Sequence, residues 1–145
     1  VYDFQSDHDF DHQADLQESR QLLKEWLLQM AEVTGIPPER SIVAGFSQGG
    51  AMAMDVGLQL PLAGALVLSG YSHSAPAPHP DLGPLLMVHG RQDPVVPIAR
   101  AHQSRDALTA QGVDVTYKEY NIGHEISPVV LQAVLMFSQR VAGKV

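Results

Sequence analysis

The sequence predicts an α/β fold in which helices cover both faces of a mostly parallel sheet. Short apolar segments alternate along the chain with longer segments of helical period, which is the order of βα units. The segments at residues 41–46, 63–69 and 85–89 lack polar alternation, as expected of parallel strands buried on both faces. The 145 residues are enough for one domain with a buried core.

The first predicted element is an amphipathic helix over residues 14–33. Its apolar residues recur at helical spacing and its charges lie on the other face, which is typical of a helix that covers a sheet. These apolar residues are Leu16, Leu22, Leu23, Trp26, Leu27, Met30 and Val33. Gly35 ends the helix, and Pro37-Pro38 prevents its resumption.

A strand at residues 41–46 is predicted to lead through a sharp turn into a helix that ends near Pro61. The strand contains no charge and no proline, so we expect an interior strand with neighbours on both sides. A second buried strand follows at residues 63–69. Residues 70–83 contain too many prolines and glycines for regular structure and are predicted to form a surface loop.

The rest of the chain continues the alternation of strand and helix. Pro97 suits the first turn of a helix and Gly112 suits its end. The last strand alternates polar and apolar residues, as expected near the edge of a sheet. The remaining predicted elements are a strand at 85–89, a loop at 90–97, a helix at 97–111, a strand at 113–120 and a helix from Ser127-Pro128.

Composition limits the classes of function. The net charge of -7 argues against binding to nucleic acid or anionic lipid, so we expect a small-molecule partner. The chain has no cysteine, which excludes disulfides and thiolate nucleophiles and favours a cytoplasmic location. Its apolar runs are far shorter than the roughly 18 residues of a membrane span, and no signal pattern begins the sequence, so no membrane insertion is expected.

Gly45-Phe46-Ser47-Gln48-Gly49 joins the first strand to the next helix. Glycine two positions before and after a serine is the pattern of a nucleophile elbow, where the backbone is strained and a Cβ at either flank would collide with its neighbours. A glycine-rich turn that merely lets a helix pack closely on a strand has the same pattern. The remaining residues of the site must distinguish these two interpretations.

Three loops at the carboxyl ends of predicted strands carry Ser47, Asp93 and His124 in that order. Loops at this edge of a parallel sheet form its ligand site. A serine nucleophile needs a base, and the base needs an acid that fixes its tautomer. Asp93 alone could be a turn residue before Pro94, and His124 alone could cap the last helix. The joint occurrence of the three in the order serine, acid, histidine favours catalysis.

Other polar residues are weaker candidates for chemistry. Residues 7–12, Asp-His-Asp-Phe-Asp-His, could gather ligands for a divalent ion, but a solvated loop with Asp11 as helix N-cap explains them as well. His89 is expected to be structural and to hold the loop of Asp93 by a hydrogen bond. We expect the other histidines at the surface, namely His8, His12, His73, His79 and His102.

Four segments of the chain share a more specific pattern. They are Gly45-Phe46-Ser47-Gln48-Gly49-Gly50-Ala51-Met52-Ala53, Leu68-Ser69-Gly70-Tyr71, His89-Gly90-Arg91-Gln92-Asp93-Pro94-Val95-Val96-Pro97 and Gly123-His124-Glu125. Together they resemble the carboxylesterase and acyl-protein thioesterase family of α/β-hydrolases, often labelled phospholipase/carboxylesterase. The resemblance spans essentially the whole chain.

This resemblance implies an α/β-hydrolase fold and a serine hydrolase that cleaves carboxylic esters or thioesters through an acyl-enzyme. It implies Ser47 as nucleophile, Asp93 as acid and His124 as base, with no metal and no organic cofactor. The backbone N–H of Gln48 lies where one oxyanion donor belongs.

Residues 1–145 resemble about the C-terminal two thirds of a family member. Members carry an upstream strand and a His-Gly loop that supplies a second oxyanion donor, and we find no counterpart of these in the sequence. We therefore expect a single α/β-hydrolase domain over residues 1–145 that lacks its N-terminal strands. The strand at 41–46 would then have one unpaired side, which invites a homo-oligomer through that edge.

Two other hypotheses compete with a serine hydrolase. The chain could be an inactive hydrolase fragment that acts as an interaction or assembly module. A nucleotide-binding α/β domain is disfavoured, because residues 45–50 have neither the Gly-x-Gly-x-x-Gly spacing nor the Lys-Ser/Thr of a P-loop.

Overall fold

The computed structural model describes residues 14–73 and 77–144. In this part of the chain four parallel strands form one sheet in the order β1-β2-β3-β4. The strands are β1 (Ile42–Phe46), β2 (Gly64–Leu68), β3 (Leu85–Gly90) and β4 (Val115–Tyr120). The helices are α1 (Ala14–Thr34), the short 3-10 helix η2 (Pro38–Arg40), α2 (Gln48–Gly57), α3 (Ile98–Ala110) and α4 (Pro128–Ala142).

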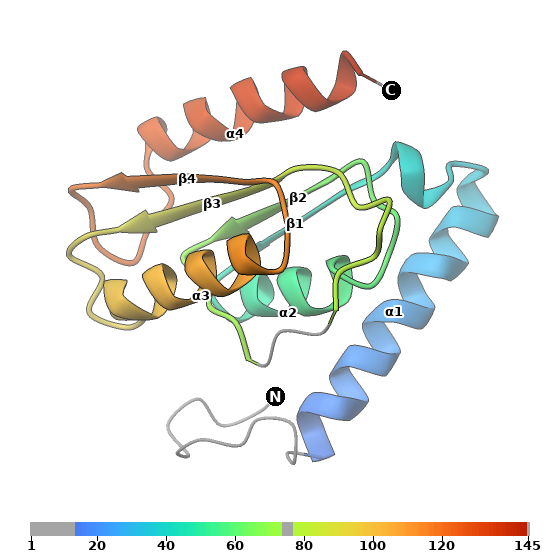
Figure 1. The fold of residues 1–145 in the computed structure, drawn as a ribbon, viewed down its shortest axis with the longest axis horizontal. Helices are drawn as coiled ribbons and strands as arrows, with labels where there is room; N and C mark the ends of the chain where they lie inside the picture. Colours follow the sequence, from blue (N-terminus) through green and yellow to red (C-terminus); the bar gives the residue numbers. More distant parts are fainter. Residues whose placement is uncertain (1–13, 74–76, 145) are drawn as a thin grey trace.

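Helices cover both faces of this sheet, with α4 on one side and α2 and α3 on the other (Figure 1). Residues of β2 and β3 alternate between two cores because successive side chains of a strand point to opposite faces. Leu66 and Leu86 pack with Phe137 of α4, whereas Val67 and Met87 pack on the face of α2 and α3. Both strands are buried throughout, which confirms the predicted α/β fold and explains their uninterrupted apolar sequence.

Most element boundaries lie within three residues of those predicted. Gly35 and Gly112 follow α1 and α3 with φ of +72° and +85°, a conformation that glycine adopts without steric cost. The helix α2 ends at Gly57, earlier than predicted, because the backbone hydrogen bonds there change from the α-helical to the 3-10 pattern. Gln59 and Leu60 donate backbone hydrogen bonds to Val56 and Gly57, three residues back.

The helix α1 forms as predicted but covers less of the core than its apolar stripe implies. Leu23 and Leu27 pack in a cluster that includes Val43 of β1. Trp26 and Val33, which belong to the same predicted stripe, have exposed fractions of 53% and 71%. Figure 1 shows α1 at the margin of the fold. The period of a sequence predicts an apolar face, but the number of partners for that face depends on tertiary packing.

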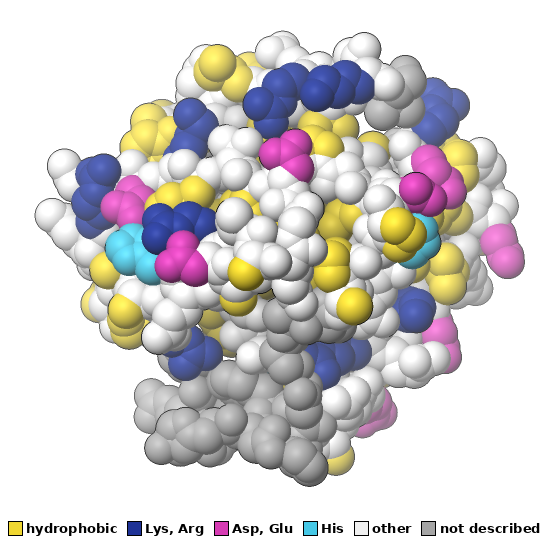
Figure 2. Space-filling view, viewed as in Figure 1, with side chains coloured by type: hydrophobic (Ala, Val, Ile, Leu, Met, Phe, Trp, Pro, Cys, Tyr) yellow, Lys and Arg dark blue, Asp and Glu magenta, His cyan; other side chains and the backbone are white. Residues whose placement is uncertain are grey.

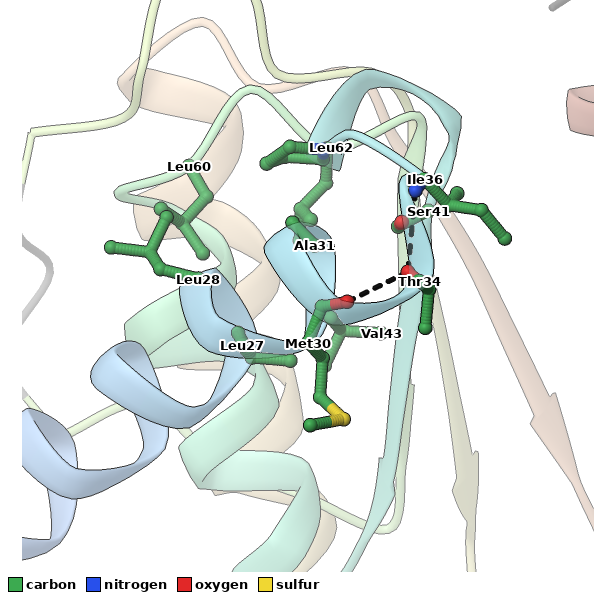
Figure 3. A pocket seen from close by; sticks show the side chains of 11 residues that line it. Leu27, Leu28, Met30, Ala31, Thr34, Ile36, Ser41, Val43, Leu60 and Leu62 are labelled. Carbon is green, nitrogen blue, oxygen red and sulfur yellow. Dashed lines mark hydrogen bonds between the residues drawn. The ribbon is translucent and has the colours of Figure 1, made fainter.

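In the part of the chain that the structure describes, β1 lies at an edge of the sheet, which agrees with the unpaired side expected for residues 41–46. Within the described residues it pairs only with β2, Ala44 is exposed and the other residues of β1 are half-buried. An apolar groove of about 250 Å³ lies between α1 and β1 (Figure 3), with Leu27, Ile36 and Val43 in its lining. The strand β4 forms the other edge and is half-exposed, as its alternation predicts.

The face of the molecule drawn in Figure 2 mixes basic, acidic and apolar side chains. Among the helices in the described ranges, none combines the length and the apolarity that crossing a bilayer requires.

Candidate active site

Ser47 lies in the sharp turn between β1 and α2. Its φ of 58° and ψ of -120° belong to a backbone region that residues other than glycine rarely adopt. The Ser47 N–H donates to the Leu68 carbonyl of β2 at 2.8 Å, which ties the turn to the neighbouring strand. The strained backbone is thus held by the sheet, and the serine stands at the carboxyl end of β1.

Only one of the two predicted flanking glycines is required by packing. A Cβ on Gly45 would lie 2.0 Å from the carbonyl oxygen of Gly49, a distance that no side chain tolerates. The position where a Cβ of Gly49 would lie has no neighbouring atom within 4 Å. Gly50, which follows, is the second tight position, with the Gly45 oxygen 3.1 Å away. The predicted collision is therefore right for Gly45 and wrong for Gly49.

We expect Gly45→Ala to lower the free energy of unfolding by about 1–3 kcal/mol, because the added methyl group must displace the backbone of Gly49. Gly49→Ala is the matched control, since it enters open space in the first turn of α2 and alanine favours helix over glycine by about 1 kcal/mol. Urea unfolding of both variants measures the difference. Equal losses of stability in the two variants would contradict this account of the turn.

Ser47, His124 and Asp93 form a continuous hydrogen-bonded chain. Nδ1 of His124 lies 2.8 Å from Oδ2 of Asp93, and Nε2 lies 2.9 Å from Oγ of Ser47. An ionised carboxylate only accepts hydrogen bonds, so Nδ1 carries a proton and Nε2 accepts from the serine hydroxyl. The structure thus brings together three predicted site residues from the ends of β1, β3 and β4.

Both oxygens of the Asp93 carboxylate accept hydrogen bonds. Its side chain is buried, and Oδ1 accepts backbone hydrogen bonds from Val95 and Val96, both at 2.8 Å. Burial opposes ionisation, but the bonds from His124, Val96 and Val95 outweigh it, and the pKa of Asp93 lies below its usual 3.8. The acid is therefore ionised at neutral pH and holds the imidazole in one orientation.

His89 supports the loop of Asp93, as the sequence predicts. The ring is buried, and Nε2 donates to the Val96 carbonyl at 2.8 Å. The same nitrogen lies 3.5 Å from Oδ2 of Asp93. On another side of the site the His124 ring packs against Phe46, with ring centroids 4.8 Å apart. The contact of His89 restricts the loop that carries Asp93, and the contact of Phe46 restricts the ring of His124.

Gln48 is the first residue of α2. The helix dipole makes the N-terminal end of α2 partly positive. The Gln48 N–H is adjacent to Ser47 in the turn, as the elbow pattern predicts. Such a position suits stabilisation of negative charge that develops beside the serine.

Sequence reasoning missed a buried polar cluster around Asp55 of α2. His73 was expected at the surface, but its side chain is buried and Nδ1 lies 2.6 Å from Oδ2 of Asp55. Arg20 of α1 donates to the same oxygen at 2.8 Å. The three residues are far apart in the chain, so no local pattern indicates that they meet.

Residues 7–12, for which a solvated loop and a metal site are the two interpretations, lie outside the described residues. Within 14–73 and 77–144, no group of three or more histidine, aspartate or glutamate side chains is placed to hold a metal ion.

Comparison with known proteins identifies relatives of the chain. Residues 1–142 match the sequence model of the Phospholipase/Carboxylesterase family. Acyl-protein thioesterase 1 of Gibberella zeae is 36% identical over 125 residues, which cover 79% of this chain and 53% of that protein. Acyl-protein thioesterase 1 homolog 1 of Dictyostelium discoideum is 31% identical over 141 residues, which cover 90% and 62%. The chain therefore spans roughly half to three fifths of these two relatives.

Solved structures agree with the sequence matches. Esterase PE8 superposes with a TM-score of 0.83 and 27% identity, over 96% of this chain and 67% of that one. SOBER1 of Arabidopsis thaliana gives a TM-score of 0.77 and 27% identity, over 86% and 63%. The parallel sheet, the strained serine turn and these matches lead to one conclusion: the chain belongs to the phospholipase/carboxylesterase family of α/β-hydrolases.

Proposed function

We propose that the chain carries the catalytic residues of a serine hydrolase that cleaves carboxylic esters or thioesters through an acyl-enzyme. The observation that carries the proposal is the hydrogen-bonded chain from Asp93 through His124 to Ser47, with contacts of 2.8 and 2.9 Å. Relatives named as thioesterases and esterases support this class of substrate. We infer a cytoplasmic location from the lack of cysteine.

In the acylation step, Oγ of Ser47 attacks the acyl carbon while Nε2 of His124 takes the hydroxyl proton. Asp93 stabilises the imidazolium that forms. The negative charge on the substrate oxygen is stabilised by the backbone N–H of Gln48. His124 then returns the proton to the alcohol or thiol, which leaves as the bond to the acyl carbon breaks.

In the deacylation step, water replaces the alcohol or thiol as the second reactant. His124 takes a proton from the water as its oxygen attacks the acyl carbon of the ester on Ser47. The tetrahedral intermediate collapses, Ser47 leaves with the proton from His124, and the carboxylic acid is released. The resting hydrogen-bonded chain is restored without any cofactor.

The competing hypothesis is an inactive hydrolase fragment that acts as an interaction module. Hydrolysis of p-nitrophenyl butyrate by the purified chain distinguishes the two hypotheses. Turnover that depends on Ser47 supports the enzyme, whereas a folded chain with neither turnover nor labelling by a fluorophosphonate probe supports the module.

We also propose that the 145-residue chain associates with a second copy of itself through the edge of β1. Within the described residues this edge presents backbone N–H and C=O groups without a neighbouring strand, next to the apolar groove of Figure 3. Edge strands that lack charged residues are templates for pairing with another chain. The sequence of β1 has no charge, whereas β4 at the other edge contains Lys118 and Glu119.

Light scattering on the purified chain should therefore give the mass of a dimer. Ala44→Lys places a charge at the exposed centre of β1 and should shift the equilibrium to the monomer, because a charged edge disfavours pairing. Gln103→Lys, at an exposed position of α3, is the matched control and should remain a dimer. A monomer at all concentrations of the unmodified chain would refute this association.

A further inference from the structure

We propose that Arg91 is a positioning residue that sets the geometry between Asp93 and His124 by joining the two loops that carry them. The acid loop is residues 91–97, after β3, and the histidine loop is residues 121–127, after β4. This inference rests on the proposed function, because it assigns Arg91 a role in the same site.

The guanidinium of Arg91 bonds two residues around the start of the histidine loop. Its Nε donates to Oε2 of Glu119 at 3.1 Å, and its Nη1 donates to Oδ1 of Asn121 at 2.9 Å. Arg91 lies two residues before Asp93, and Asn121 lies three residues before His124. One rigid planar group therefore connects the backbone segments that lead to the acid and to the base.

Backbone contacts continue the same junction. The Arg91 N–H donates to the Tyr120 carbonyl at 2.8 Å, and the Gln92 N–H donates to the Ile122 carbonyl at 3.1 Å. A Cβ on Gly90 would lie 2.3 Å from the carbonyl oxygens of both Ile122 and Gly123. The two loops thus lie in direct contact, and glycine at residue 90 permits that approach.

Glu119 of β4, which accepts the bond from Arg91, is held by two further side chains. Its carboxylate pairs with His102 of α3 and accepts from the Tyr117 hydroxyl at 2.7 Å. The bonds from His102 and Tyr117, aided by Arg91, lower the pKa of Glu119 to about 2. Arg91 therefore pairs with a carboxylate on β4 that His102 and Tyr117 hold in place.

The contacts of Arg91 predict an effect on catalysis that exceeds the effect on stability. Its side chain is 50% exposed, and exposed ion pairs contribute little to folding. Within the described residues its side-chain hydrogen bonds go to Glu119 at the end of β4 and to Asn121 in the histidine loop, so Arg91 acts by holding these segments in place. A displacement of about 1 Å in a catalytic group can lower a rate by roughly 100-fold.

The test compares variants that separate geometry from charge. Arg91→Met removes both bonds and the charge, Arg91→Lys keeps the charge, and Asn121→Ala removes one bond without changing any charge. We expect kcat to fall about tenfold in Arg91→Met and about threefold in Asn121→Ala, with KM unchanged and partial rescue in Arg91→Lys. Arg140→Met is the control, since Arg140 also bonds a β4 side chain, Thr116, at 3.4 Å.

A second readout does not depend on turnover. Nuclear magnetic resonance of the chain, labelled with ¹⁵N in histidine, reports the two ring nitrogens of His124 and the proton shared with Asp93. We expect these signals to move in Arg91→Met and Asn121→Ala and to stay unchanged in Arg140→Met. Moved signals in an inactive protein would refute the proposed function and support the role of Arg91. Unchanged signals and unchanged kcat in both variants would overturn this inference.

Discussion

Replacing Ser47 with alanine is expected to abolish labelling by a fluorophosphonate probe and to lower kcat for p-nitrophenyl butyrate by up to about 10⁶-fold. The hydroxyl at 2.9 Å from Nε2 of His124 is the group that would form the acyl bond. Without it, His124 and Asp93 have no nucleophile to activate. The measurement is mass spectrometry of the labelled chain together with steady-state kinetics.

Ser69→Ala is the matched control for this substitution. Among the described residues, Ser47 and Ser69 are the two non-glycine positions with positive φ, and each follows the carboxyl end of a strand. Ser69 is buried and its N–H bonds the Val88 carbonyl at 2.9 Å. Labelling should persist in Ser69→Ala. Labelling that survives in Ser47→Ala would move the nucleophile to another residue.

Asp93→Asn is expected to leave the fold intact and to lower kcat about 10⁴-fold, as the same change does in a serine protease triad. The amide oxygen can still accept the bonds from Val95 and Val96 that Oδ1 of Asp93 accepts. An amide carries no charge to stabilise the imidazolium of His124, and its N–H group favours the wrong tautomer of the ring. Circular dichroism checks the fold, and kinetics measures the loss.

The same substitution has a predicted pH dependence of stability. The folded protein lowers the pKa of Asp93 below 3.8, so the carboxylate stabilises the fold above that pH and loses this contribution as pH falls through the lowered pKa. The difference in unfolding free energy between the original chain and Asp93→Asn should shrink in acid. Asp106→Asn, at an exposed aspartate of α3, is the matched control substitution. A loss of kcat under tenfold in Asp93→Asn would return Asp93 to the role of a turn residue.

Local sequence patterns predict most of the helices and strands of the fold. Residues 63–69 and 85–89 were predicted as buried strands because a strand covered on both faces needs apolar residues at every position, and β2 and β3 have that environment. The strand at 41–46 also forms, and within the described residues it has one unpaired side, as expected. Its apolar sequence predicts which residues pack on each face, but hydrogen-bonding neighbours lie in the plane of the sheet, where side chains carry no signal.

The sequence by itself determined the order of strands and helices, the turn at Ser47 and the placement of Asp93 and His124 after successive strands, because these depend on neighbours along the chain. Only the tertiary structure decided that Gly45 and not Gly49 is sterically required, and that Arg91 joins two loops. These features depend on contacts between residues distant in sequence, and such contacts exist only once the sheet has brought the ends of its strands together.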